Sequence, residues 1–239
     1  RWQWFRRTRF FMDGSYVVSL VQQRGHGVTE IQRKPAPDTY PWILIGLLWM
    51  VSFLNAADRS ILNSVKPLLR DAFDITDIQL GIIDTTFFWT YAVCAFVFGR
   101  VGDSVRRRNM IIFGLIFWSM ATGIMPFATG FAMLLGMRTL VAIGESTYYP
   151  TATALISAWH KPSMRSRALS FHQTAVFAGG GIGGWVAGKL ADSYGWSAPF
   201  VIFAALGFVV MAILFKLLRD DAPKEVRASE IKRAEPIGV

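Results

Sequence analysis

Six long apolar stretches constrain this chain more than any other feature of its sequence. Crossing the hydrocarbon core of a bilayer, about 30 Å thick, takes about 20 mostly apolar helical residues. One stretch, MIIFGLIFWSMATGIMPFA, contains no charged residue, and another, APFVIFAALGFVVMAILFKLL, meets its first charge only at Lys216. The six stretches cover roughly residues 41–64, 78–99, 110–128, 131–154, 168–189 and 197–218. They predict an all-α fold, a polytopic helical membrane protein with a bundle of six transmembrane helices.

Charged residues are scarce and unevenly placed. They make up 17% of the chain, against about 25% in soluble domains. Of the 25 Lys and Arg, twenty fall in residues 1–41, in the connections after the second and fourth stretches, and from Lys216 onward. Because Lys and Arg collect in cytoplasmic loops, both termini are expected to face the cytoplasm, with the chain in the plasma or inner membrane. The net charge of +9 then reflects membrane topology and does not indicate a nucleic-acid partner.

The two ends of the chain lie outside the apolar stretches, and the bundle is assigned to residues 40–219. Residues 1–39 lack an apolar core followed by a small-residue cleavage site, so no secretory signal is predicted. They are expected to be a cytoplasmic segment or sequence upstream of the natural start. Residues 220–239 are polar and mixed in charge, which is typical of a cytoplasmic tail or the start of a long loop. The single cysteine, Cys94, excludes an internal disulfide.

Four charged residues interrupt the apolar stretches: Asp58 and Arg59 in the first, and Arg138 and Glu145 in the fourth. A helical rise of 1.5 Å per residue places Asp58 and Arg138 at similar depth, each about 10 Å from the outer end of its helix. Glu145 is about 10 Å deeper, on the same face as Arg138. Asp58 and Arg59 point about 100° apart, so one can face a cavity while the other faces a neighbouring helix.

These charges allow two interpretations. One is a static network of ion pairs that joins the first and fourth helices, although apolar packing would join them without the cost of desolvation. The other is a carboxylate that exchanges protons beside an arginine that binds an anion. A low dielectric favours the neutral carboxyl and a nearby arginine favours the charged one, so a substrate that occupies the arginine alters the balance. Asp84 lies near the outer end of the second helix and is expected to be structural.

The fifth stretch contains AGGGIGGWVAG, with Gly180, Gly184 and Gly188 at four-residue intervals. Small residues at this spacing let helices approach closely. The pattern predicts helix packing at these glycines, and a contact that slides during a conformational change is a further hypothesis. Pro150 is expected to kink the fourth helix, and Pro126 to end the third.

The connection after the second stretch, GRVGDSVRRRN, resembles the signature loop of the major facilitator superfamily. That loop has the form Gly, three residues, Asp, basic, any, Gly, Arg, basic. Gly99, Asp103, Arg107 and Arg108 match it, whereas Ser and Arg occupy two positions that are usually basic and Gly. The resemblance implies a charged latch with helix ends on the cytoplasmic side, which favours the outward-facing state. A loop that only fixes topology is the alternative.

The charges of the first and fourth stretches resemble those of two branches of the superfamily. The anion:cation symporters move organic acids with protons, and the Spinster-like transporters move lipidic or amphipathic compounds. The symporter resemblance implies that Asp58 and Glu145 are proton-coupling sites and that Arg59 and Arg138 are substrate-binding or coupling arginines. The sequence GESTYYP departs from the Gly-Glu-Ala that is more usual there.

The superfamily fold has twelve helices in two halves, with the substrate at their interface. The resemblance therefore implies that this chain is one half, and a fragment of a longer protein that lacks its carboxy-terminal six-helix partner. The function expected of the complete protein is proton-coupled secondary transport of a small organic anion by alternating access. No cofactor and no metal are expected.

Two alternatives remain open. An aromatic run that includes Phe87, Phe88, Trp89 and Tyr91 could line a pocket for an exported amphipathic compound, although such runs more often pack against lipid or helices. The other alternative is a six-span structural protein or membrane enzyme. Of the three histidines only His172 lies in an apolar stretch, and neither Gly-x-Ser-x-Gly nor His-Glu-x-x-His is present. An enzyme is therefore not expected.

Overall fold

The computed structural model describes residues 39–219, apart from the side chains at positions 103 and 104. The segments expected on either side of the bundle, residues 1–38 and 220–239, lie outside the described residues. Within the described part the chain is helical. Its elements are α1 (Tyr40–Phe73), α2 (Asp77–Ser104), α3 (Arg107–Ile124), η1 (Met125–Phe127), α4 (Phe131–Ser146), α5 (Tyr148–Trp159), α6 (Pro162–Ala178), η2 (Gly179–Gly183), α7 (Gly184–Tyr194) and α8 (Ala198–Leu217).

These elements form the six expected spans. Four of them are single helices long and apolar enough to cross a membrane: α1, α2, α3 with its short extension η1, and α8. The fourth span is divided into α4 and α5, and the fifth into α6, the π-helical turn η2 and α7. The structure confirms an all-α bundle of six membrane spans.

Local sequence explains where several helices begin and end. The long helix α1 ends at Asp74, which takes a left-handed conformation (φ 52°) and donates its N–H to the carbonyl of Arg70. Two residues later Thr76 starts α2, because its side chain and that of Gln79 cap each other's backbone N–H groups. α3 ends at Ile124, and Pro126 follows in the short turn η1.

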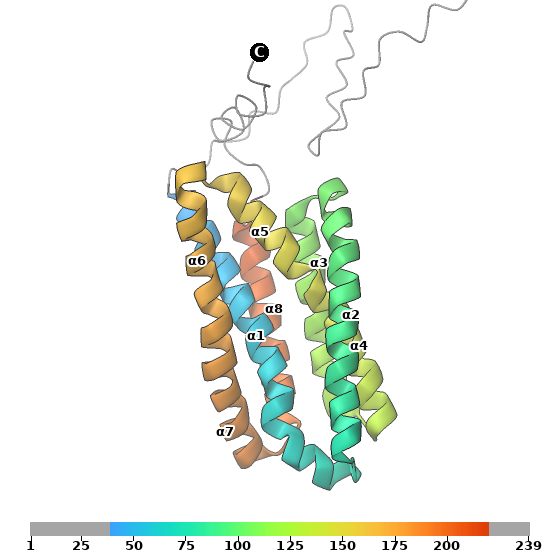
Figure 1. Ribbon diagram of the computed structural model, residues 1–239. Helices are drawn as coiled ribbons and strands as arrows, with labels where there is room; N and C mark the ends of the chain where they lie inside the picture. The colour runs from blue at the N-terminus through green and yellow to red at the C-terminus, as the bar shows by residue number, and fades with distance from the viewer. Residues whose placement is uncertain (1–38, 220–239) are drawn as a thin grey trace, which may run out of the picture. The chain divides into compact units, whose positions relative to one another are not determined.

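The break between α4 and α5 falls at Thr147, three residues before Pro150. Proline lacks the N–H that would bond to the carbonyl four residues earlier, which weakens the helix at this point. The Thr147 hydroxyl donates to the Gly144 carbonyl at 2.8 Å and so satisfies one backbone group of the break. The interruption lies two residues after Glu145, and α5 leaves it at a different angle (Figure 1).

Helix α1 is the most buried of the four spans that are single helices. In the most apolar 18-residue segment of α1, 61% is buried inside the bundle, whereas the corresponding share in α2 is 17%. On one side it packs along α6, η2 and α7, and it also contacts α8 and α5, while α3 and α4 pack together with α2 beside them (Figure 1). The two ends of the described chain meet at one end of the bundle, where the Tyr40 hydroxyl donates to the Leu217 carbonyl at 2.9 Å.

Candidate functional site

The first feature of the site is an ion pair between α1 and α4. Arg59 Nε donates to Glu145 Oε2 at 2.7 Å, and Arg59 Nη2 donates to Asn55 Oδ1 at 3.0 Å, one turn back on α1. The Glu145 side chain is completely buried, whereas that of Arg59 is 30% exposed. The cation is therefore the member of the pair that a molecule outside this half can reach.

Two aromatic rings of α2 complete the surroundings of the arginines. The Arg59 guanidinium lies 4.4 Å from the centre of the Tyr91 ring and 5.6 Å from that of Phe87. The Arg138 guanidinium lies 4.2 Å from the centre of the same Phe87 ring. A cation over an aromatic face is stabilised by the ring quadrupole, more strongly where water is excluded. Phe87 thus holds two cations, one from α1 and one from α4.

The aromatic run on α2 is divided between two directions. Phe87 is buried, while Phe88 and Trp89 are 61% and 70% exposed. The stretch does not form one continuous aromatic lining. Phe87 and Tyr91, four residues apart on one helix face, belong to the charged site, and the residues between them face away from the core.

Arg138 and Asp58 are both buried to 4% exposure. Each has a polar atom without a hydrogen-bond partner in the described chain: Nε of Arg138 and Oδ1 of Asp58. The other oxygen of Asp58, Oδ2, accepts a hydrogen bond from Thr122 Oγ1 on α3 at 2.7 Å. Asp58 and Arg59 therefore face different helices, as the angle between neighbouring residues on a helix predicts.

Four of these residues lie together, and we call them the buried charge cluster: Asp58, Arg59, Arg138 and Glu145. Its two acids and two arginines are close enough to interact electrostatically, and their formal charges cancel. A desolvated cluster with no net charge is less costly than a single buried charge. The structure thus brings together all four intramembrane charges that the sequence singled out.

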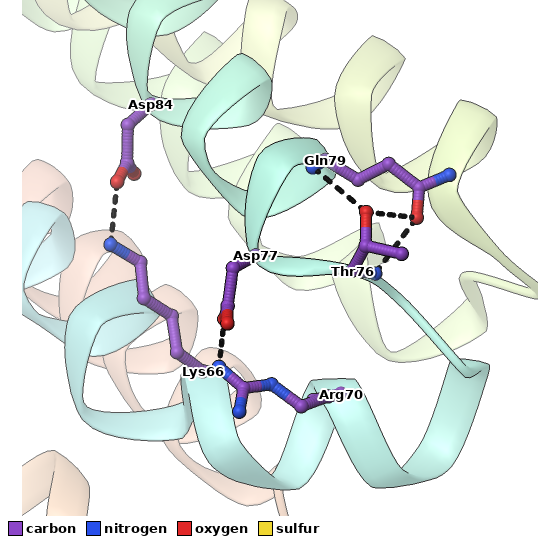
Figure 2. A network of polar contacts seen from close by, with 6 residues as sticks. All are labelled: Lys66, Arg70, Thr76, Asp77, Gln79 and Asp84. Atoms are coloured by element: carbon purple, nitrogen blue, oxygen red, sulfur yellow. Dashed lines mark hydrogen bonds and ion pairs between the residues drawn. The ribbon is translucent and has the colours of Figure 1, made fainter.

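Asp84 lies in a second set of polar contacts, at the α1–α2 turn (Figure 2). Lys66 Nζ pairs with Asp84 Oδ2 at 2.5 Å, and one turn further along α1 Arg70 pairs with Asp77. Thr76 and Gln79 cap the start of α2 beside them. These contacts join the two helices at the end of the bundle opposite Tyr40, which fits the structural role expected for Asp84.

The loop that matches the superfamily signature lies at the other end of the bundle. Gly99 is in α2, and the side chain of Asp103 lies outside the described residues. Arg107 donates to the Ala154 carbonyl of α5 at 3.2 Å. Arg108 donates to the carbonyls of Phe215 and Leu218, at 2.5 Å and 2.7 Å, where α8 ends. These contacts within one half were not foreseen from the sequence, and the latch itself stays a prediction.

The glycines of the fifth span that approach α1 most closely are two others than the three that the spacing suggests. A Cβ placed on Gly179 would lie 2.3 Å from the Phe53 carbonyl oxygen, and one on Gly183 would lie 2.3 Å from Ala57 Cβ. On Gly180 and Gly184 it would lie 3.9 Å and 3.4 Å from Ser60, and on Gly188 it would meet nothing within 4 Å. The closest approach of α1 is therefore at Gly179 and Gly183.

A further polar junction was missed by sequence reasoning. The Tyr148 hydroxyl donates to the Leu48 carbonyl at 2.5 Å and lies 2.8 Å from His172 Nε2. Because the phenol has one hydrogen, which goes to Leu48, the imidazole supplies the other hydrogen through Nε2. The junction ties α5 to α1 and α6 just after the α4–α5 break. Only the pairing of a tyrosine and a histidine in apolar stretches could have signalled it.

The described residues contain no group of three His, Cys, Asp or Glu side chains placed to hold a metal ion.

A six-span helical bundle with a buried, charge-balanced cluster defines a polytopic membrane protein whose charged cluster lies inside the bundle. Residues 48–237 match the Major Facilitator Superfamily. The chain belongs to this superfamily.

Several known proteins are similar to this chain. The hexuronate transporter of Bacillus subtilis (strain 168) is 26% identical over 198 residues, covering 83% of this chain and 46% of the transporter. Protein spinster homolog 1 of Homo sapiens is 34% identical over 181 residues, covering 74% of this chain and 34% of that protein. The crystal structure of a bacterial homolog to the human lysosomal transporter Spinster, inward-facing and unoccupied, superposes with a TM-score of 0.73 at 26% identity, covering 79% of this chain and 45% of that one. This chain spans between a third and a half of the length of these relatives.

Proposed function

We propose that the complete protein is a secondary transporter that couples protons to the movement of a small organic anion by alternating access. This chain supplies one half of the translocation path, and a second six-helix half supplies the other. The observation that carries the proposal is the Arg59–Glu145 ion pair, in which the arginine is partly exposed and the acid is buried.

The ion pair suggests how substrate and proton are coupled. An anionic substrate that binds Arg59 competes with Glu145 for the same guanidinium. Once Glu145 loses its partner, its charge is costly in a low dielectric, and the carboxylate takes up a proton. When the substrate leaves, Glu145 releases the proton and pairs with Arg59 again.

Charge balance supports the binding of one proton together with each anion. The buried charge cluster carries no net formal charge before substrate binds. One anionic substrate adds one negative charge, and one proton on Glu145 or Asp58 removes it. Arg138 remains charged throughout, since a guanidinium does not deprotonate in proteins, and Phe87 holds it in place.

A transport assay with reconstituted full-length protein tests the anion-binding step. A hexuronate is the first probe, because one relative is named a hexuronate transporter. We expect Arg59→Ala to abolish saturable uptake and Arg59→Lys to raise the KM, since lysine keeps the charge but loses the planar fork. Arg70→Ala is the matched control, because Arg70 forms an exposed ion pair at the α1–α2 turn. Uptake that survives Arg59→Ala would overturn the proposal.

A second candidate is transport of an amphipathic or lipidic compound. It is favoured by the similarity to spinster proteins and by the aromatic rings of Phe87 and Tyr91 beside the arginines. The two candidates are distinguished by a panel of substrates in which each organic acid is tested beside its own long-chain derivative. Preference for the derivative, with competition by uncharged amphiphiles, favours the second candidate.

We also propose that both ends of this half face the cytoplasm of a plasma or inner membrane. Support comes from the basic residues around the ends and from the contacts of Tyr40 with Leu217 and Arg219, which place both ends of the described chain together. Reporter fusions at residue 38 and residue 220 test this orientation. Activity typical of the external side at either fusion would contradict it.

A further inference from the structure

Asp58 and Ser119 form an unexplained pair of buried polar atoms. Within residues 39–219, Oδ1 of Asp58 and Oγ of Ser119 both lack a hydrogen-bond partner, although their residues are 4% and 2% exposed. Both residues line one narrow crevice between α1, α3 and α8, together with Trp118, Thr122, Phe203 and Gly207. The crevice has no room for a water molecule. Unpartnered buried polar groups are costly and call for an explanation.

The chemistry of the two atoms is complementary. An ionised carboxylate only accepts hydrogen bonds, whereas a protonated one has an O–H to donate, and a serine hydroxyl can accept it. Thr122 already donates to Oδ2 of Asp58. Ser119 is three residues before Thr122 on α3, so the two hydroxyls lie on the same face of that helix.

The missing side chain of Gly207 on α8 leaves room for the Ser119 hydroxyl. A Cβ at Gly207 would lie 2.1 Å from Ser119 Oγ. The hydroxyl therefore occupies the space that any other residue at position 207 would fill. Rotation about the Ser119 Cα–Cβ bond moves the oxygen between rotamers, so the hydroxyl is able to leave its place beside Gly207.

We infer that Ser119 is a positioning residue of the proton site: it accepts a hydrogen bond from Asp58 when that side chain is protonated on Oδ1. Thr122 continues to donate to Oδ2, so both oxygens of the neutral acid are then held by α3. The proton joins the carboxylate and no other bond changes. This inference rests on the proposed function, since it assigns a partner to one of the two proposed proton sites.

The surroundings of Asp58 show what protonation changes. Arg138 and Glu145 act on it from α4, and Arg59 acts from α1 itself. Among the described residues that line the crevice, α3 contributes hydroxyls and α8 contributes apolar side chains and glycine. The charged acid is repelled by Glu145 and attracted by Arg138, both on α4, and it accepts a hydrogen bond from Thr122. Protonation removes the repulsion by Glu145 as well as the attraction to Arg138, and it leaves the neutral acid held by α3.

The two hydroxyls of α3 give opposite expectations, which makes the test sharp. Ser119→Ala removes a partner of the protonated acid, so the pH profile of transport shifts to lower pH by about 0.5 to 1 unit. Thr122→Val removes a donor to the charged acid, so the profile shifts to higher pH by a similar amount. Ser119→Thr, which keeps a hydroxyl, is expected to have a profile close to that of the parent. The matched control is Ser60→Ala, because the Ser60 hydroxyl bonds to the Ala56 carbonyl of its own helix, and we expect no shift.

The measurement is gradient-driven uptake between pH 5 and 8 by the reconstituted full-length protein, with substrate counterflow as a readout of folding and binding. Counterflow within twofold of the parent accompanies the expected shifts. Profiles that move in the same direction in both α3 variants, or that do not move in Ser119→Ala, overturn the role of Ser119. If Ser119→Ala accumulates poorly, Ser119→Cys, whose thiol is a weak acceptor, is measured against the same criteria.

The failure of this inference is distinguishable from failure of the proposed function. If parent transport depends on pH, Asp58→Asn abolishes that dependence and Ser119→Ala leaves it unmoved, only the role of Ser119 is lost. If parent transport ignores both pH and Asp58→Asn, proton coupling itself is wrong, and this inference falls with it.

Discussion

Arg59 of α1 and Glu145 of α4 form a 2.7 Å ion pair in which the Glu145 carboxylate is buried and the Arg59 guanidinium is partly exposed. The pair joins the two helices that carry all four intramembrane charges. Because Arg59 also contacts Asn55 and Tyr91, its position is fixed before any ligand arrives. A preorganised cation of this kind binds an anion without first losing side-chain freedom.

The ion pair predicts a stability effect that separates charge from packing. Arg59→Gln leaves Glu145 buried and unpaired, which is expected to lower the stability by about 3 to 5 kcal/mol. The double variant Arg59→Gln and Glu145→Gln removes both charges and is expected to recover most of that loss. Thermal unfolding of the purified protein in detergent measures the difference. If the single and double variants are equally stable, the ion pair contributes nothing to stability beyond the packing of its two side chains.

The contact between the fifth span and α1 predicts a contrast between two glycines. Gly183→Ala places a methyl group against Ala57 and is expected to cost about 1 to 3 kcal/mol, as overpacking of a tight contact does. Gly188→Ala meets no atom within 4 Å and is expected to stabilise the helix by about 0.5 to 1 kcal/mol. The same unfolding assay compares them. If the two substitutions have equal effects, the close approach at Gly183 is absent in the folded protein.

His160, in the loop between α5 and α6, predicts a pH dependence of stability. Its Nδ1 lies 2.8 Å from the Ile156 carbonyl and donates to it, while its Nε2 is buried and has no partner among the described residues. Burial lowers the pKa of His160 below its ordinary value of 6.5. The folded state therefore holds this imidazole neutral, and the unfolded state binds the proton more readily.

Stability contributed by His160 is present above pH 6.5 and is lost as the pH falls through the lowered pKa. The unfolding temperature is expected to drop between pH 7.5 and pH 5, and His160→Gln is expected to reduce that drop. The comparison is made in one detergent at constant ionic strength. A drop of the same size in the variant would assign the effect to other groups.

The fold was predictable from the sequence because one physical requirement outweighs the others. A bilayer demands about 20 apolar residues per helix, and six such stretches leave one helical solution. Proline effects at Pro126 and Pro150 also followed from a missing N–H. The capping pair Thr76 and Gln79 fits the pattern of a polar residue and a glutamine three positions later, but the expected span began two residues after Thr76.

The site was predictable in its members but not in its pairing. The cost of a buried charge singles out Asp58, Arg59, Arg138 and Glu145 wherever they lie. Which acid meets which arginine depends on the rotation of each helix about its axis. One residue of rotation, about 100°, decides that Glu145 pairs with Arg59 while Asp58 turns to Thr122. The same rotation puts Gly179 and Gly183, and not Gly188, against α1.

The central claim, that the buried charge cluster takes up one proton for each anion it binds, is tested most directly by measuring proton movement during substrate flux. Liposomes with the full-length protein and an internal pH indicator receive an inward gradient of the organic anion and no pH gradient. We predict that the lumen acidifies with substrate entry and that Glu145→Gln abolishes the acidification while counterflow continues. The control variant is Asp192→Asn, which changes an exposed acid. With this variant the lumen is expected to acidify as it does with the parent. Substrate entry with no acidification in the parent, or unchanged acidification in Glu145→Gln, would contradict the account.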